Sequence, residues 1–506
     1  MPESRDCAFE LPHWLDAAAR SYPDRLALAF EAQRWSYAEL RTISAAAAAR
    51  IADSSSRRNE RIGILSSNRP GWVFAAHAAT MLGVPFVPLN WRQSTAEIAW
   101  QVRDAQITCL IADDDRLNAA TAIGKRNSVA ILRMNDLESA EVVPGARPGP
   151  SRIDLRDDAA ILYTSGTTGR PKGARITYGN LWFSAVGSAL YLGHARDDVW
   201  LAALPLFHIG GLSILFRAVI GGIPVMLHDR FVAGTVLQAI DNGATLVSVV
   251  PTMLQRLLDE RGGSPWPASL RCLLVGGSAT PSELVEASLR VGIPIAPTYG
   301  LTEGSTQVTT LLPSDVSRKP ASSGLPLPGT EVRITTPTRS PSVGEIGEIE
   351  FRGPTRFAGY LGENNVCTDR DGDGWFQTGD IGYLDGECFL YVIDRRADLI
   401  VSGGENIYPA EIERILLEHP RVADAAVVGV PDEEWGARPV AAVVWMGDPA
   451  AAQGELLHHC AGRMARFKIP ERFVLMEALP RSASGKMLRR EIRDAIAVPG
   501  PDSGRS

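Results

Sequence analysis

Small hydroxyl residues, glycines and one lysine are concentrated in a single short stretch that follows the apolar run 159–162. This stretch reads Tyr163-Thr164-Ser165-Gly166-Thr167-Thr168-Gly169-Arg170-Pro171-Lys172-Gly173-Ala174. Glycines let backbone N–H groups approach a ligand closely, and the hydroxyl and ammonium groups add donors suited to phosphate oxygens. The composition favours a loop over a helix or strand. We therefore predict a phosphate-binding loop after a buried strand. A plain surface turn is the alternative, and the order of residues is not that of a Walker A loop.

Further polar segments follow apolar runs, where the ends of strands would gather them. Thr298-Tyr299-Gly300-Leu301-Thr302-Glu303 comes after the run 293–297, and Gly276-Gly277-Ser278 comes after the run 271–275. In α/β folds ligands collect at the carboxyl ends of the strands, so these segments are candidates for one site. Taken alone, each segment also fits a capped strand end or an ordinary glycine turn.

Two charged candidates stand on glycine-rich segments nearer the C-terminus. Thr378-Gly379-Asp380 supplies a carboxylate, an acceptor suited to vicinal hydroxyls. Ser484-Gly485-Lys486 supplies a compact charge on a flexible stem, and a solvated surface lysine is the alternative reading. The segment 369–374 opens like a calcium loop, but its twelfth position is Asp380 rather than glutamate. A turn rich in Asp and Gly is the alternative there.

In this combination the segments resemble the adenylate-forming superfamily of acyl-CoA synthetases, luciferases and peptide-synthetase adenylation domains. The resemblance implies that the chain activates a carboxylic acid with ATP as an acyl-AMP and then forms a thioester, releasing AMP. It implies ATP, Mg²⁺ and coenzyme A (CoA) as cofactors. A carboxylate must then approach a triphosphate, and preorganised donors and a metal ion are suited to neutralising these charges.

The resemblance implies a role for each matching residue. Lys486 bridges the carboxylate and the α-phosphate, Thr302 bonds the α-phosphate, and Glu303 holds Mg²⁺. Lys172 supplies charge to the phosphates, and His208 lies beside the carboxylate, although a lone histidine after an apolar run is more often a packed core residue. The residues implied in cofactor binding are Thr164, Ser165, Gly166, Thr167, Thr168, Gly169, Gly276, Gly277, Ser278, Tyr299, Gly300, Asp380, Arg395, Gly403 and Gly404.

Several of these cofactor residues have a specific implied part. Tyr299 stacks on adenine, and Asp380 accepts the ribose hydroxyls with help from Arg395. Gly403 and Gly404 line the path of the CoA pantetheine arm, where glycines permit close passage of a thin chain.

The resemblance also implies a division into two domains. Residues 1–397 form an N-terminal domain that binds ATP and the acid, and residues 398–506 form a mobile C-terminal domain. Asp398 is the implied hinge, where a few backbone torsions would swing the small domain between the two half-reactions.

The hydrophobic patterns predict an α/β fold. Helical patterns such as 36–51 and 180–192 alternate with short apolar runs up to about residue 300, which favours parallel sheets with crossover helices. Short alternating runs between 324 and 390 predict an antiparallel, barrel-like subdomain. A smaller α/β segment follows, with a helix expected over 456–465.

Composition sets limits on function and compartment. The 506 residues include 51 Lys and Arg and 58 Asp and Glu, which gives a net charge of −7. The sequence therefore lacks the excess of positive charge that is typical of proteins that bind nucleic acid. No run of eighteen uncharged apolar residues and no signal pattern is present, so we expect a cytoplasmic protein without a membrane span. The six scattered cysteines favour small buried residues over zinc or disulfides. A homodimer is common in the superfamily.

The acid is the least determined part of the function. Beyond the shared motifs, the segment 201–213 and its neighbours resemble the 2-succinylbenzoate–CoA ligases of menaquinone biosynthesis, with departures at Gly210 and Gly304. A dicarboxylate needs a second anchor, and arginine can bind a carboxylate bidentately. The proposed pocket residues are Arg92 or Arg217, with Ser305, Thr306 and Gln307 as a polar wall; both arginines could equally lie on the surface.

Three other functions stay open at this stage. One is an aryl or medium-chain acyl-CoA ligase with the same mechanism, and another is a free-standing adenylation enzyme that loads a carrier protein. Assays with free CoA separate these two. The third is a non-enzymatic sensor, which is disfavoured because Lys486 and Glu303 are both present.

Overall fold

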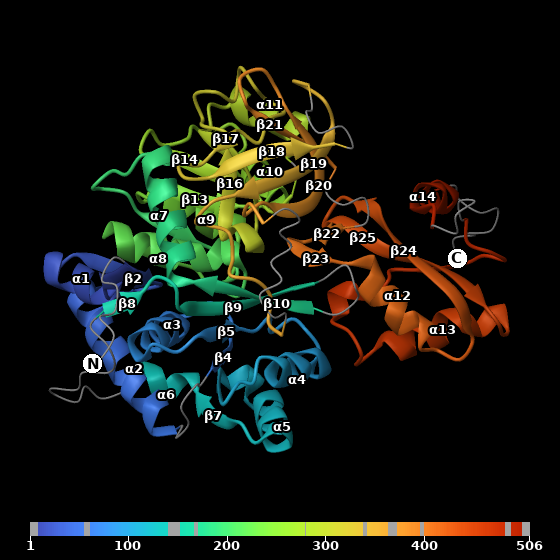
Figure 1. The fold of residues 1–506 in the computed structure, drawn as a ribbon, viewed down its shortest axis with the longest axis horizontal. Helices are drawn as coiled ribbons and strands as arrows, with labels where there is room; N and C mark the ends of the chain where they lie inside the picture. Colours follow the sequence, from blue (N-terminus) through green and yellow to red (C-terminus); the bar gives the residue numbers. More distant parts are fainter. Residues whose placement is uncertain are drawn as a thin grey trace. The chain divides into compact units, whose positions relative to one another are not determined.

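The computed structural model describes residues 9–54, 61–139, 152–165, 171–278, 280–336, 342–362, 372–394, 399–480 and 487–497 (Figure 1). The chain divides into two compact units. The first unit comprises Met1–Trp91, Gln101–Tyr163 and Gly173–Asp394, and the second comprises Arg92–Trp100, Thr164–Lys172 and Arg395–Ser506. The boundary at 397/398 stays a prediction, because residues 395–398 lie outside the described part of the chain.

The largest sheet of the first unit has nine strands in the order β17-β16-β15-β14-β13-β11-β12-β2-β3. The pairs from β15 through β2 are parallel, and the strands at both ends are antiparallel. The strands are β2 (Leu26–Phe30), β3 (Gln33–Ser36), β11 (Trp200–Ala202), β12 (Val225–Leu227), β13 (Leu246–Val249), β14 (Cys272–Val275), β15 (Ile295–Leu301), β16 (Thr306–Thr310) and β17 (Leu325–Pro326).

A second sheet of six strands has the order β10-β9-β5-β4-β6-β7, with parallel pairs from β9 to β7. Its strands are β4 (Ile62–Leu65), β5 (Phe86–Pro88), β6 (Cys109–Ala112), β7 (Ala130–Arg133), β9 (Asp158–Ser165) and β10 (Pro171–Thr177). Strands such as β4, β6, β13 and β14 are buried along their whole length. Parallel strands read as continuous apolar runs because both of their faces are covered, so the predicted parallel α/β architecture is confirmed.

Helices connect and cover these strands (Figure 1). They are α1 (Trp14–Ser21), α2 (Tyr37–Ser54), α3 (Pro70–Leu82), α4 (Thr95–Asp104), α5 (Leu117–Asn127), α6 (Met134–Glu138), α7 (Tyr178–Leu192), α8 (Ile209–Gly221), α9 (Ala233–Asp241), α10 (Pro251–Arg261) and α11 (Ser282–Arg290), with short 3₁₀ turns at Asp114–Arg116 and Thr302–Gly304. Helix α7 begins with a full capping box, because Thr177 and Asn180 bond each other's backbone N–H groups. A small antiparallel pair, β1 (Glu10–Pro12) with β8 (Arg152–Asp154), completes the N-terminal region.

The short alternating runs after residue 324 form a four-stranded antiparallel sheet, as predicted. Its order is β18-β19-β20-β21, from β18 (Glu331–Thr335), β19 (Gly347–Arg352), β20 (Phe376–Leu384) and β21 (Leu390–Asp394). Register shifts in β19–β20 and β20–β21 mark bulges, which increase the local twist and curl the sheet.

The second unit is a smaller α/β body with its own apolar core around Ile412, Val427 and Leu456. Its elements are the hairpin β22 (Ile400–Ser402) and β23 (Glu405–Ile407), the sheet β24 (Val422–Asp432), β25 (Gly436–Trp445) and β26 (Phe473–Leu475), and helices α12 (Pro409–Leu417), α13 (Pro449–Cys460) and α14 (Arg489–Ala497), with a 3₁₀ turn at Arg466–Lys468.

The helix expected over 456–465 was misplaced. The observed helix α13 begins at Pro449, where the Asp448 side chain accepts a bond from the Ala450 N–H. Proline at the first helical position after an aspartate cap fixes this start. Helix α13 ends at Cys460, shortly before Gly462, whose φ of +77° is left-handed.

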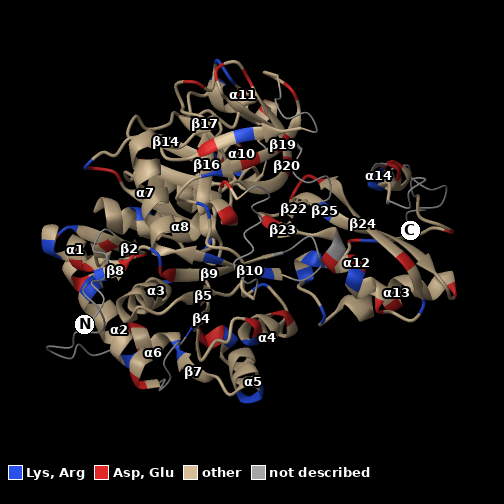
Figure 2. Cartoon of the chain, in the orientation of Figure 1, with Lys and Arg blue, Asp and Glu red and all other residues tan. Residues whose placement is uncertain are grey.

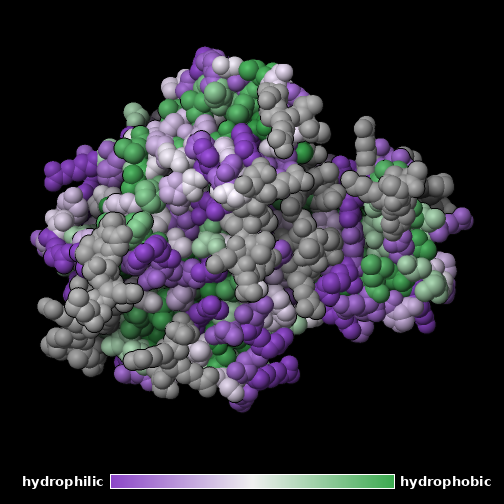
Figure 3. Space-filling model, in the orientation of Figure 1, coloured by the Kyte–Doolittle hydropathy of each residue, from purple (hydrophilic) through white to green (hydrophobic). Residues whose placement is uncertain are grey.

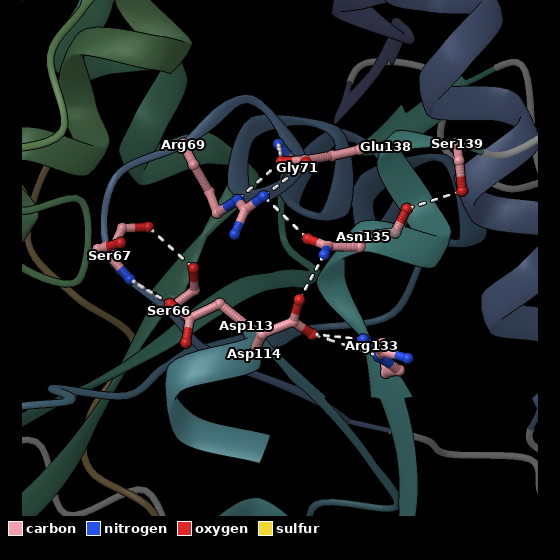
Figure 4. Close-up of polar contacts among 10 residues, drawn as sticks. All are labelled: Ser66, Ser67, Arg69, Gly71, Asp113, Asp114, Arg133, Asn135, Glu138 and Ser139. Carbon is pink, nitrogen blue, oxygen red and sulfur yellow. Dashed lines mark hydrogen bonds and ion pairs between the residues drawn. The ribbon is translucent and has the colours of Figure 1, made fainter.

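Polar side chains tie together the carboxyl ends of β4, β6 and β7 (Figure 4). Arg69 donates to both oxygens of Glu138, at 2.8 and 2.6 Å, and to the Asn135 side chain at 2.9 Å. Asn135 in turn donates to Asp114 at 2.6 Å. The Arg69–Glu138 pair is bidentate, so it fixes geometry as well as adding energy, and it locks α3 and α6 to this edge of the sheet.

Charged and apolar residues are mixed on the surface. Basic and acidic residues lie interspersed along the helices of both units (Figure 2), and hydrophilic groups border the apolar areas of the drawn face (Figure 3). None of the helices in the described ranges combines the length and apolarity needed to cross a membrane. The expectation that the cysteines are buried holds for Cys109, Cys272 and Cys460 but not for Cys388, which is exposed.

Two histidines are enclosed in the core of the first unit. His13 lies 3.1 Å from the Thr80 hydroxyl, and His77 packs edge-on against Phe216 with ring centroids 6.0 Å apart. Burial lowers the pKa of His77 to about 3 and that of His13 to about 4, because charging either ring would bring an ion into an apolar environment.

We predict that the free energy of unfolding of the first unit decreases as pH falls from about 6.5 towards 4. The unfolded histidines take up protons near pH 6.5, whereas the folded ones stay neutral, so each contributes a slope of up to ~1.4 kcal/mol per pH unit. Urea unfolding at pH 7.5 and pH 5 should therefore show a smaller loss in a His77→Leu variant than in the unmodified chain. An equal loss in both proteins would contradict this origin of the acid sensitivity.

Candidate active site

The polar segments predicted for the nucleotide meet at one edge of the nine-stranded sheet. Strands β14 and β15 are parallel neighbours with Val275 opposite Pro297, so Gly276–Ser278, which follows β14, begins beside Thr298 of β15. The tyrosine motif does not simply follow the strand as expected. Instead, β15 continues through Leu301 and pairs there with β16 in antiparallel register.

A single 3₁₀ turn carries the predicted phosphate and metal residues. Thr302, Glu303 and Gly304 form this turn directly after β15. Tyr360 donates its hydroxyl to Glu303 Oε1 at 2.6 Å, and the Phe357 N–H donates to the Glu303 carbonyl at 2.8 Å. The carboxylate of Glu303 is therefore oriented by a segment more than fifty residues away.

The predicted ribose carboxylate lies in contact with the predicted adenine residue. Asp380, on β20, accepts a 2.6 Å hydrogen bond from the hydroxyl of Tyr299, on β15. Both residues are buried, with 9% and 3% of their surface exposed. The first unit thus brings together Asp380 and the Tyr299–Glu303 segment.

The backbone immediately after Glu303 is strained. Ser305 has φ +54° and Thr306 has φ +108°, a left-handed pair in which the β-branched threonine is a clear outlier. A Cβ on Gly300 would lie 1.7 Å from the Thr306 carbonyl oxygen, so only glycine allows this approach. Strained backbone of this kind clusters at ligand sites, where the surrounding structure holds it in place.

A buried arginine stands beside the strained turn. Arg217 of α8 donates to the hydroxyl of Thr306 at 2.5 Å and to that of Ser184 at 3.4 Å, and its guanidinium lies over the Trp200 ring at 5.5 Å. Only 6% of Arg217 is exposed, and within the described ranges it has no carboxylate partner. Burial without a partner lowers the pKa of Arg217 to about 9.

Several buried polar atoms on α7, on α8 and in or next to β16 lack hydrogen-bond partners among the described residues. The Nε atom of Arg217, the hydroxyls of Ser188 and Ser305, and the carbonyl oxygen of the Gln307 side chain are buried without a partner among the described residues. Buried polar groups are nearly always paired in native proteins, so the unpaired Nε of Arg217 is a donor suited to an acceptor such as a carboxylate. Of the predicted polar wall, Thr306 contacts Arg217 directly, and Ser305 and Gln307 are its neighbours in the sequence.

His208 and Arg217 lie on one helix. His208 is the N-cap residue of α8, and its ring packs on Phe207 with centroids 4.7 Å apart. It follows β11, which belongs to the same parallel sheet as β14 and β15. Side chains on a helix point towards its N-terminus, so the Arg217 side chain points towards the N-terminal end of α8, where His208 is the N-cap residue.

The second unit contains the other described candidates. Thr164 and Ser165 end β9, and Lys172 lies in β10, so the loop predicted over 163–174 is wrong at both ends, where the segment is strand. Its middle, Gly166, Thr167, Thr168 and Gly169, lies outside the described residues, as do Arg395, Asp398 and Lys486. Their roles stay predictions.

The predicted pantetheine glycines form a hairpin turn. Gly403 and Gly404 connect β22 to β23 and have φ of +57° and +85°, as a two-residue hairpin turn requires. Arg92 donates to Glu405 in this hairpin at 2.7 Å. Because Glu405 already compensates the charge of Arg92, the structure favours Arg217 as the anchor for a second carboxylate.

Within the described ranges no group of three or more His, Cys, Asp and Glu side chains could hold a metal ion, and residues 369–371 of the alternative calcium loop lie outside them. Mg²⁺ is usually held by one or two carboxylates together with substrate phosphates and water. Glu303 is a carboxylate of this kind, and its role as the Mg²⁺ ligand stays a prediction.

Sequence reasoning missed two residues that the structure adds, Tyr360 and Ser184. Tyr360 and Ser184 gave no motif, because their contacts with Glu303 and Arg217 join distant segments. A signal was available for Ser184, since Ser184 and Ser188 place small polar residues four apart on the buried face of α7. The departure at Gly304 also has a reason, because a Cβ there would lie 2.7 Å from the Val308 side chain.

Comparisons with known proteins agree with this architecture. Residues 15–361 match the family of AMP-binding enzymes, and residues 411–486 match the AMP-binding enzyme C-terminal domain. The 2-succinylbenzoate–CoA ligase of Bacillus cereus is 40% identical to the chain over 96% of its length and 98% of the relative.

A solved relative is the o-succinylbenzoate CoA synthetase of Bacillus subtilis, which is 41% identical over 96% of the chain. The structure of a double mutant of that enzyme bound to a product analogue gives a TM-score of 0.89, and the match covers 98% of its chain. The complex with the acyl-adenylate intermediate gives a TM-score of 0.74, with 98% of its chain covered. The complex with ATP and magnesium gives 0.73, with 100% covered. The chain therefore belongs to the family of AMP-binding enzymes and groups within it with the 2-succinylbenzoate–CoA ligases.

Proposed function

We propose that the chain is an AMP-forming ligase that joins 2-succinylbenzoate to CoA through an acyl-AMP intermediate. The observation that supports this substrate is the burial of Arg217. This cation has no carboxylate partner in the described part of the chain and lies next to the turn that bears Glu303. An acid with two carboxylates can present one to ATP and the other to Arg217.

The residues of the chain have distinct parts in this reaction. Thr302 donates to the α-phosphate, and Asp380 accepts the ribose hydroxyls. Lys172 neutralises phosphate charge, and Lys486 bridges the carboxylate and the α-phosphate. Glu303 would hold Mg²⁺ together with the phosphates of ATP, and the ion would supply neutralisation of charge in the transition state.

A second carboxylate would compensate Arg217. A carboxylate accepts hydrogen bonds but donates none, so it can pair with the Nε and the other N–H donors of Arg217. Pairing inside a dry pocket is strong, since the surrounding medium screens the charges weakly. A monocarboxylic acid would leave these donors and the buried charge uncompensated.

Other elements of the proposal rest on the resemblance and on the relatives. We infer a cytoplasmic location, where ATP and CoA are supplied, and a homodimer as in other family members. Loading of a carrier protein stays the alternative for the second half-reaction, with a different acid as the alternative for the first.

The purified chain should form 2-succinylbenzoyl-CoA from the acid, ATP, Mg²⁺ and free CoA. Mass detection across 2-succinylbenzoate, benzoate, octanoate and malonate is expected to show the highest kcat/KM for 2-succinylbenzoate. Turnover dominated by another acid would overturn the substrate assignment. Pyrophosphate exchange without thioester would show that free CoA is not the acceptor.

An Arg217→Met variant should lose activity towards 2-succinylbenzoate and gain stability. Removing the partner of a buried carboxylate costs about 2.7 kcal/mol or more, which corresponds to about 100-fold in kcat/KM. Removing an uncompensated buried charge from the free protein should raise its unfolding free energy by ~1 kcal/mol or more. Initial rates with 2-succinylbenzoate and a monocarboxylate analogue, together with urea unfolding, measure both effects.

Arg271→Met is the matched control. Arg271 donates to the buried Asp198 at 2.6 Å, so its removal leaves a carboxylate uncompensated. This variant should lose about 2 kcal/mol of stability without changing the ratio of the two substrates. If Arg217→Met instead destabilised the protein and lowered both activities equally, Arg217 would be a structural arginine.

A further inference from the structure

Two tyrosine hydroxyls in the first unit donate to the two carboxylates of the site. Tyr360 Oη lies 2.6 Å from Glu303 Oε1, and Tyr299 Oη lies 2.6 Å from Asp380 Oδ2. We propose that both tyrosines are positioning residues: Tyr360 orients Glu303 towards Mg²⁺, and Tyr299 orients Asp380 towards the ribose. The inference rests on the proposed function, from which it takes the roles of the two carboxylates.

A neutral hydroxyl is well suited to this task. It restricts the orientation of the carboxylate without adding charge, and hydrogen bonds from a hydroxyl to a carboxylate are short and strong. A lysine or arginine in its place would add a positive charge that repels Mg²⁺ and lowers the basicity of the carboxylate. Tyrosine therefore fixes direction without reducing the negative charge.

The ring of Tyr360 is held by aromatic packing and by backbone pairing. It lies edge-on to Phe357 with centroids 4.8 Å apart, and Phe357 packs in the same way on Phe376 at 5.3 Å. Tyr360 also forms a backbone bridge with Ala174 on β10, and the neighbouring Leu361 N–H donates to the Gly173 carbonyl at 2.9 Å. The hydroxyl therefore points in a direction that is set by two sheets.

The Tyr299 ring is more deeply buried than a ring that stacks on adenine would be. With 3% of its surface exposed, the ring offers little face for stacking, which is the role that the family resemblance implies. Its hydroxyl meets Asp380, whose own N–H donates to the Thr378 hydroxyl at 3.1 Å. Side chain and backbone of Asp380 are thus both fixed by contacts within the first unit.

Two single variants test the proposal and serve as controls for each other. In Tyr360→Phe, Mn²⁺ affinity measured by electron paramagnetic resonance with the non-hydrolysable analogue α,β-methylene-ATP should fall about 10- to 100-fold. The ratio of AMP to 2′-deoxy-AMP affinity, measured by calorimetry, should not change. In Tyr299→Phe, the AMP preference should fall about 10-fold, and Mn²⁺ affinity should not change.

Tyr391→Phe provides the structural control, because its hydroxyl lies 3.4 Å from Asp385 within the antiparallel sheet. It should change neither readout. The double variant Tyr360→Phe with Glu303→Gln should bind Mn²⁺ no more weakly than Glu303→Gln alone, since Tyr360 acts through that carboxylate.

Unchanged Mn²⁺ affinity in Tyr360→Phe, or additive losses in the double variant, would overturn the assignment of Tyr360. An unchanged AMP preference in Tyr299→Phe, or effects of both variants on both readouts, would overturn the assignment of Tyr299. Because these measurements use no acid and no turnover, they stay informative even if 2-succinylbenzoate proves not to be the substrate.

Discussion

The uncompensated charge of Arg217 is the constraint on which the site depends. Enclosing a guanidinium without a carboxylate is unfavourable, and its pKa falls to about 9 as a result. The protein compensates with the hydroxyls of Ser184 and Thr306 and the ring of Trp200. The bond to Thr306 also supports the left-handed backbone at that residue, directly after the turn that bears Glu303. The proposed anchor for the acid and the turn that bears Glu303 are thereby linked through Thr306.

The fold explains how segments far apart in the sequence reach this place. Parallel strands deliver Gly276–Ser278 and the Tyr299–Glu303 segment to one sheet edge, and the antiparallel sheet adds Asp380 beside them. Carboxylates gathered in this way would repel one another and adopt several rotamers. The neutral hydroxyls of Tyr360 and Tyr299 donate to Glu303 and Asp380 and restrict them without cancelling their charge, as the proposed binding of Mg²⁺ and ribose would require.

Secondary structure that depends on neighbouring residues could be predicted from the sequence, whereas contacts between residues far apart in the sequence could not. Apolar periodicity and turn residues were enough to predict the parallel α/β sheets and the antiparallel sheet. The choice between Arg92 and Arg217 required the structure, because only contacts show that Glu405 pairs with Arg92 while Arg217 lacks a carboxylate among the described residues. The start of α13 was misplaced because the cap at Asp448 lies ahead of the clearer apolar pattern.

The most direct test of the central claim is a calorimetric double-mutant cycle on binding. A stable acyl-adenylate analogue of 2-succinylbenzoate and its methyl ester at the second carboxylate are titrated into the unmodified chain and into Arg217→Met. The account predicts that the unmodified chain prefers the free carboxylate about 100-fold, equivalent to about 2.7 kcal/mol, and that the preference disappears in the variant. The same preference in both proteins would contradict it, because the second carboxylate would then be recognised elsewhere.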